Sequence, residues 1–142
     1  YRKDVFRKLG GFEKHTIFNE DMIYAAKAVK AGYRIAYAAE ARVYHSHNYT
    51  AGEQFHRNFD NGVSQAQHPE VFSGVSSESE GIKMVKKTMT HLWKNRKPWL
   101  MLRFAADCAA RYLGFFLGKH YRSLPAGLTA RCSMNRDYWK RR

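Results

Sequence analysis

The sequence predicts an α/β first part followed by a mostly helical, basic second part, and three observations support this division. Helix and strand signals alternate over residues 1–72. A Ser- and Gly-rich run at residues 73–81 has the composition of a linker. Residues 1–72 contain 10 basic and 8 acidic side chains, whereas residues 73–142 contain 15 and 4, so most of the net charge of +13 lies in the second part. We therefore expect a domain at 1–72, a linker at 73–81 and an extension at 82–142.

Apolar periodicity and turn residues place the elements of the first part. Gly10-Gly11 ends a short helix, Asn19 is expected to cap the next helix, and Gly32 ends it. Two strands rarely form a stable sheet, so we expect the other strands outside this sequence, which starts at Tyr1 and has the character of a fragment. Helices are expected over residues 2–9, 20–32 and 51–63, and strands over residues 33–37 and 42–45.

The second part has the pattern of two amphipathic helices. Every third or fourth residue from Ile82 to Leu92 is apolar, and the lysines fall largely away from that face. Pro98 suits the first turn of a second helix, which should run to about Gly114 or Gly118. Because charged residues interrupt its apolar stretch, this helix is a poor candidate for crossing a membrane.

Glu20-Asp21 is the first candidate site, because two adjacent carboxylates begin an apolar helix. A carboxylate within hydrogen-bond reach can remove the proton of an attacking hydroxyl group, which is general-base catalysis. The alternative is structural, since the helix dipole alone favours acidic residues in a first helical turn.

His45 and His47 are the second candidate. Alternate residues of a strand point to the same side, so both imidazole rings can reach one metal ion or one phosphate. The alternative is a pair of surface histidines. No cysteine or carboxylate stands nearby at metal-ligand spacing, so any metal site needs ligands from elsewhere.

Gln54 and Arg57 are the third candidate, because they lie three residues apart on one face of a helix. An arginine in this position can hold a diphosphate through paired hydrogen bonds. The alternative is an ordinary solvated helix face.

The basic second part suggests a fourth site, since lysine and arginine alternate there with tryptophan, tyrosine and phenylalanine. Such a surface suits an anionic membrane or a nucleic acid, and the structural alternative is a helical subdomain with a basic exterior. Nucleic acid binding does not explain the motifs of the nearly neutral first part, so no nucleic acid partner is expected. A non-catalytic membrane-docking or assembly module remains the main alternative to an enzyme.

Several short motifs follow one another in the first part: Gly10-Gly11-Phe12, Glu20-Asp21, Ala31-Gly32-Tyr33, Glu40-Ala41 and His45. In this order they resemble the second half of a family 2 glycosyltransferase domain, which has the GT-A fold. Residues 45–50, 57–63 and the tail from 112 to 139 are more similar to bacterial rhamnosyltransferases. The resemblance therefore implies the C-terminal portion of a GT-A domain followed by the helical extension.

The resemblance also implies roles for single residues. Asp21 would be the general base that deprotonates the acceptor hydroxyl group, and Glu20 would help to shape the acceptor site. His45 would complete a site for Mg²⁺ or Mn²⁺, with His47 as the alternative ligand or a substrate-binding residue. Gln54 and Arg57 resemble the Gln-x-x-Arg-Trp motif of processive relatives, but Asn58 replaces its tryptophan, so processivity is not predicted.

The subgroup implies an inverting transfer of L-rhamnose from dTDP-L-rhamnose to a lipid-linked surface polysaccharide. The enzyme would lie in the bacterial cytoplasm, peripheral on the inner face of the membrane, and self-association into a homo-oligomer is a further expectation. The family's Asp-x-Asp metal motif and nucleotide-binding strands precede the region matched here, and this sequence contains no Asp-x-Asp. The metal site is therefore expected to be incomplete, and these residues alone are expected to be inactive.

Overall fold

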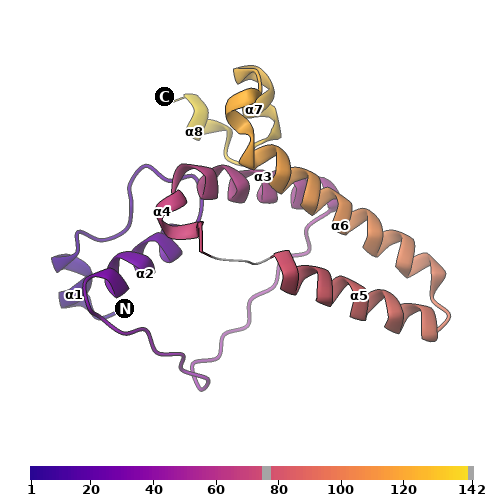
Figure 1. Ribbon diagram of the computed structural model, residues 1–142, viewed down its shortest axis with the longest axis horizontal. Coiled ribbons are helices and arrows are strands. Elements are labelled where there is room, and N and C mark those ends of the chain that lie inside the picture. Colours follow the sequence, from indigo (N-terminus) through magenta and orange to yellow (C-terminus); the bar gives the residue numbers. More distant parts are fainter. Residues whose placement is uncertain (75–77, 141–142) are drawn as a thin grey trace.

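The computed structural model describes residues 1–74 and 78–140, and this part of the chain contains helices and irregular segments but no strand (Figure 1). The helices predicted from the sequence are all present, and the described residues add four short ones near the ends of the longer helices. The elements are α1 (Lys3–Lys8), α2 (Glu20–Lys30), α3 (Ala51–Gln67), α4 (Pro69–Phe72), α5 (Glu78–Lys94), α6 (Pro98–Lys119), the 3₁₀ helix η1 (Tyr121–Ser123), α7 (Ala126–Cys132) and α8 (Arg136–Lys140).

Local sequence signals explain where α2 ends and where α3 begins. Gly32 has φ +85°, and the amides of Gly32 and Tyr33 donate to Val29 and Ala28, which closes the end of α2 as glycine-terminated helices do. The hydroxyl oxygen of Thr50 accepts a hydrogen bond from the Glu53 amide at 3.3 Å, and the Glu53 carboxylate accepts from the Thr50 amide at 2.8 Å. This reciprocal pair is a capping box, and it satisfies amides that the first turn of α3 would otherwise leave unpaired.

The segment from residue 33 to residue 49, between α2 and α3, differs from the sequence prediction. The strands expected over residues 33–37 and 42–45 are absent, and both ranges are irregular chain that is exposed apart from the half-buried Tyr33. A strand is stabilised by hydrogen bonds to a neighbouring strand, and the described chain contains no strand that could supply them. The α/β fold class expected for the first part therefore stays a prediction.

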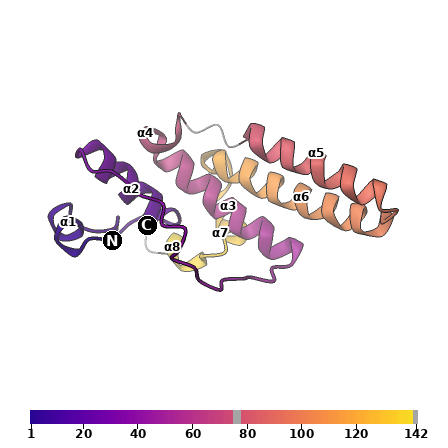
Figure 2. The same cartoon turned by 90° about the horizontal axis from the view of Figure 1, so that it is seen from below.

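The helices α3 and α6 cross with their backbones in contact, at the centre of the molecule (Figure 2). Gly62 of α3 faces the backbone of Phe115 and Lys119, and Gly114 and Gly118 of α6 face the carbonyl groups of Phe55 and Phe59. A side chain at any of the three glycines would overlap the opposite helix. Small residues four apart thus allow the close approach, as they do in other tightly packed helix pairs.

The hydrophobic core lies beside this crossing and joins both sides of the predicted linker. Its buried members come from the loop before α2, from α3, and from the C-terminal segment: Ile17, Phe59, Val63, Tyr121 and Cys132. The predicted linker is helical from Glu78 onward, and residues 75–77 lie outside the described residues. The two parts on either side of the predicted linker therefore pack together in this core, and the domain boundary at residues 73–81 stays a prediction.

A carboxylate of α3 holds the C-terminal segment against the core. Asp60 is 2% exposed, and its Oδ2 atom accepts hydrogen bonds from the amides of Met134 and Asn135 at 3.0 and 3.1 Å. His56, one turn earlier, contacts the carbonyl oxygen of Cys132 through Nδ1 at 2.8 Å. Burial raises the pKa of Asp60, although hydrogen bonds from Ser133, Asn135 and Met134 act in the opposite direction.

Stability is expected to depend on pH through Asp60. A carboxyl group whose pKa is raised in the folded protein contributes most below its unfolded pKa, and the contribution disappears as the pH rises through the folded pKa. The unfolding free energy of the wild type should therefore fall relative to that of Asp60→Asn as the pH rises from acidic to neutral values. Urea unfolding of both proteins across that range measures it, and a difference independent of pH would contradict the prediction.

The helices α5 and α6 form an antiparallel hairpin that projects from the rest of the molecule (Figures 1 and 2). Half-buried side chains such as Val85, Met89 and Phe104 lie along it, but no residue from Gly81 to Leu113 is buried. None of the helices in the described chain has the length and apolar character needed to span a membrane.

Candidate functional site

The chain before α2 is fixed to α3 by polar contacts, which positions the Glu20-Asp21 pair. The Ser64 hydroxyl donates to the carbonyl oxygen of Phe18 at 2.7 Å, and Asn19 Nδ2 donates to Asn61 Oδ1 at 2.8 Å. Asn19 precedes α2 as predicted, but its backbone is left-handed (φ 61°) and its side chain does not cap the helix. Its side chain bonds to Asn61 instead, which places the start of α2 against α3.

Asp21 lies at the edge of a cavity of about 470 Å³ that is lined by α1, α2 and residues 33–36. Its Oδ1 atom accepts a hydrogen bond from the Met22 amide at 2.8 Å, and its side chain is exposed. Tyr24, Tyr33 and Arg34 also line the cavity, whereas Glu20 does not. Asp21 is therefore accessible to a hydroxyl group that enters the cavity.

Arg57 lies between two aromatic rings. Its guanidinium carbon is 4.6 Å from the centre of the Phe18 ring and 5.7 Å from that of Tyr49. Contacts of this kind attract a cation through the negative face of the ring and restrict the side chain. Arg57 thus lies next to the segment that leads into Asp21, with a charge suited to an anionic group.

The two histidines reach Arg57 through Tyr49. The His45 and His47 rings are 4.4 Å apart and nearly perpendicular, and His47 stacks on Tyr49 with 4.8 Å between ring centres. The structure therefore links the second and third candidates, which the sequence analysis treated separately, through a row of ring contacts from His45 to Arg57. In the described ranges, however, no hydrogen bond or ion pair joins Asp21 to Arg57 or to either histidine.

The described residues do not make a complete metal site. No group of three or more histidine, cysteine, aspartate or glutamate side chains is placed to hold a metal ion within residues 1–74 and 78–140. His45 and His47 offer two nitrogen ligands, whereas Mg²⁺ and Mn²⁺ favour octahedral sites with mainly oxygen ligands. The described residues thus supply at most part of such a site.

Gln54 lies one turn before Arg57 on α3, half-buried, and its carbonyl oxygen accepts a hydrogen bond from Asn58 Nδ2 at 2.7 Å. Sequence reasoning did not identify Phe18, Tyr49 and Asn61, which position Arg57 and the start of α2. The sequence gives only a partial indication of these residues: Phe18 lies close to the Glu20-Asp21 motif and Tyr49 lies close to the two histidines.

Comparison with known proteins finds two relatives that match nearly the whole of this chain. It is 46% identical to the O-antigen chain rhamnosyltransferase WbaN of Salmonella anatum over 142 aligned residues, which cover 98% of this chain and 44% of the relative. The O-antigen chain rhamnosyltransferase RfbN of Salmonella typhimurium gives the same identity and coverage. No family model matches the chain, and no solved structure matches it.

The chain is thus a homologue of the O-antigen chain rhamnosyltransferases along its whole length, and the predicted resemblance to bacterial rhamnosyltransferases is confirmed. It spans less than half of the length of the curated relatives it matches.

Proposed function

We propose that this chain is the acceptor-side part of an inverting family 2 glycosyltransferase with a GT-A fold. The enzyme would transfer L-rhamnose from dTDP-L-rhamnose to a lipid-linked O-antigen glycan at the inner face of the bacterial membrane. The observation that carries the proposal is the position of Asp21 at the edge of a cavity. Asp21 belongs to the motif that predicts the catalytic base, and the chain is a homologue of rhamnosyltransferases.

The transfer would be a single displacement. Asp21 accepts the proton of the acceptor hydroxyl group, whose oxygen forms a bond to the anomeric carbon of rhamnose. The bond between that carbon and the diphosphate oxygen breaks with its electron pair, so dTDP leaves and the configuration inverts. Because attack and departure occur on opposite faces of the sugar, Asp21 has to lie on the side away from the diphosphate.

Arg57 and the histidines would act on the anionic part of the substrates. The guanidinium group between Phe18 and Tyr49 can pair with phosphate oxygens, and a restricted arginine loses less conformational freedom when it binds. Gln54 and His47 are the further candidates for substrate contacts. His45 would contribute one ligand to a Mg²⁺ or Mn²⁺ ion that lowers the charge on the leaving diphosphate, with the other ligands from outside the described residues.

A transfer assay with the protein as its gene encodes it tests the proposal. Radiolabelled dTDP-rhamnose and membranes that contain unfinished lipid-linked glycan should yield labelled glycolipid when Mn²⁺ or Mg²⁺ is present. Chelation of the metal ion should abolish the transfer, and re-addition should restore it. Equal transfer from UDP-glucose, or no transfer from dTDP-rhamnose, would refute the donor assignment, and transfer after chelation would refute the metal requirement.

A further inference from the structure

The turn that joins α5 and α6 carries an unusual combination of exposed side chains. Trp93 and Trp99 flank it and are 73% and 76% exposed. Between them, Lys94, Arg96 and Lys97 are all exposed. Two large aromatic side chains so exposed at one turn indicate a surface that a binding partner covers.

The turn is well defined by backbone contacts. The Arg96 amide donates to the Trp93 carbonyl oxygen at 3.0 Å, and the Lys97 amide donates to that of Leu92 at 3.1 Å. Arg96 takes a left-handed backbone, with φ 52°. These contacts hold the two indoles and the three cations together at one end of the hairpin.

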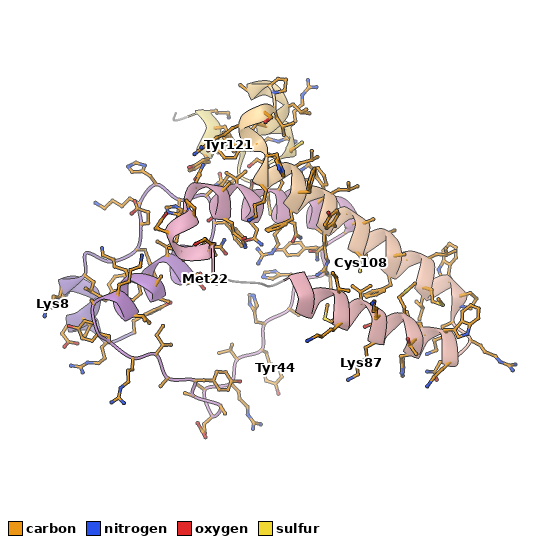
Figure 3. The ribbon with its side chains drawn as sticks, in the orientation of Figure 1. Lys8, Met22, Tyr44, Lys87, Cys108 and Tyr121 are labelled. Atoms are coloured by element: carbon orange, nitrogen blue, oxygen red, sulfur yellow. The ribbon has the colours of Figure 1, made fainter. Side chains whose placement is uncertain are left out.

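The part of the hairpin around the turn carries charge of one sign. Residues 82–106 contain seven lysines and arginines and no aspartate or glutamate. Figure 3 shows Lys87 on the side of α5 that points away from α6. A partner that covers residues 82–106 should therefore be anionic over a broad area, which an anionic bilayer surface provides more naturally than a single protein patch.

A hollow of about 530 Å³ lies at the turn. Trp93, Lys94, Arg96, Lys97, Pro98 and Met101 line it. Its lining combines cations with apolar side chains, which suits a lipid headgroup with the start of its acyl chains. Tryptophan is the side chain that membrane proteins favour at this depth, because its ring is amphipathic.

We propose that the α5–α6 turn is a membrane-docking tip, in which Lys94, Arg96 and Lys97 bind anionic lipid headgroups while Trp93 and Trp99 enter the interface. The tip lies at the end of the hairpin farthest from α3, so no other described element blocks its approach to a bilayer (Figures 1 and 2). The inference rests on the proposed location of the enzyme at the membrane, but it does not depend on the transfer reaction.

Vesicle binding tests the tip without any sugar substrate. The full chain should bind vesicles that contain phosphatidylglycerol, bind phosphatidylcholine vesicles far more weakly, and dissociate as salt rises. Each basic side chain near an anionic surface contributes a factor of about five in affinity, so Lys94→Gln/Arg96→Gln/Lys97→Gln should weaken binding on the order of 100-fold. Trp93→Ala/Trp99→Ala should weaken it about tenfold or more.

Two matched controls separate the tip from general charge and hydrophobicity. Lys3→Gln/Lys8→Gln/Lys14→Gln removes the same charge from exposed positions elsewhere. Tyr37→Ala/Tyr44→Ala removes two other exposed aromatic rings. Both controls should bind phosphatidylglycerol vesicles within about twofold of the wild type.

Wild-type tryptophan fluorescence provides a measurement that needs no variant. It should shift to shorter wavelength on vesicles and be quenched by brominated acyl chains, because Trp93 and Trp99 enter the bilayer. The proposal is refuted by equal losses in the tip and control variants, or by the absence of quenching. It is also refuted if the tip variants keep vesicle binding but lose self-association in sedimentation, which would assign the surface to a second copy of the chain.

Discussion

Replacement of Gly118 by alanine should destabilise the chain by at least about 3 kcal/mol, or prevent folding. The added methyl group would overlap the Phe59 carbonyl oxygen and lie 3.0 Å from the Val63 amide nitrogen. Both atoms belong to the backbone of α3, so no side-chain rotation relieves the overlap and the helices must move apart. Gly114→Ala should behave similarly, because its methyl group would overlap the carbonyl oxygen of Phe55.

Gly52→Ala is the matched control for this prediction. Gly52 also lies in α3, but no atom is within 4 Å of the position that a side chain would take. Alanine favours a helix over glycine, so this change should be neutral or stabilise by up to about 1 kcal/mol. Urea unfolding of the variants measures the differences. A Gly118→Ala protein as stable as Gly52→Ala would show that the helices do not cross in contact.

Replacement of Asp21 by asparagine should lower rhamnosyl transfer by a factor of about 100 to 10,000. Asparagine keeps the size of the side chain and an oxygen that can accept the Met22 amide, but it cannot take the proton of the acceptor. Donor binding should change little, because the proposed contacts to the diphosphate come from Arg57 and the histidine side. The transfer rate and the donor affinity of the protein as its gene encodes it are the two quantities to measure.

Asp4→Asn separates catalysis from the alternative role of Asp21 in helix stability. Asp4 is also an exposed aspartate in the first turn of a helix, so both substitutions remove a favourable interaction with the helix dipole. If Asp21 only stabilises α2, the two variants should transfer rhamnose equally well. A large loss confined to Asp21→Asn supports the role as general base.

The helices that were predicted from the sequence are those encoded by local signals. The apolar spacing and the terminal Gly32 defined α2, and Pro98 marked the first residue of α6. The strands at residues 33–37 and 42–45 depend on neighbours that the described chain does not contain, so the alternating pattern alone did not produce them.

The helix crossing and the arrangement of the site could not be predicted, because both depend on residues far apart in the sequence. The sequence does not indicate that Gly62 would contact the backbone of α6 or that Gly114 would contact the backbone of α3. The candidates around Arg57 were chosen from their residue types and spacing in the sequence, and their roles stay predictions. Their connection through Phe18 and Tyr49 depends on a fold that brings residues on either side of α2 to α3. The roles of Asp21 and His45 in the reaction remain predictions.

The hairpin sets the distance between the proposed membrane-docking tip and the helix crossing. The 16 residue-to-residue steps from Pro98 to Gly114 correspond to about 24 Å along α6, at 1.5 Å per step. If the α5–α6 turn binds the bilayer, the number of helical turns would set the distance from the membrane surface to the helix crossing and to Asp21 beyond it. If Asp21 is the general base, the hairpin would act as a spacer that sets this carboxylate at the level of a growing glycan. Lengthening or shortening both helices by equal turns would change which sugar of the acceptor is within reach.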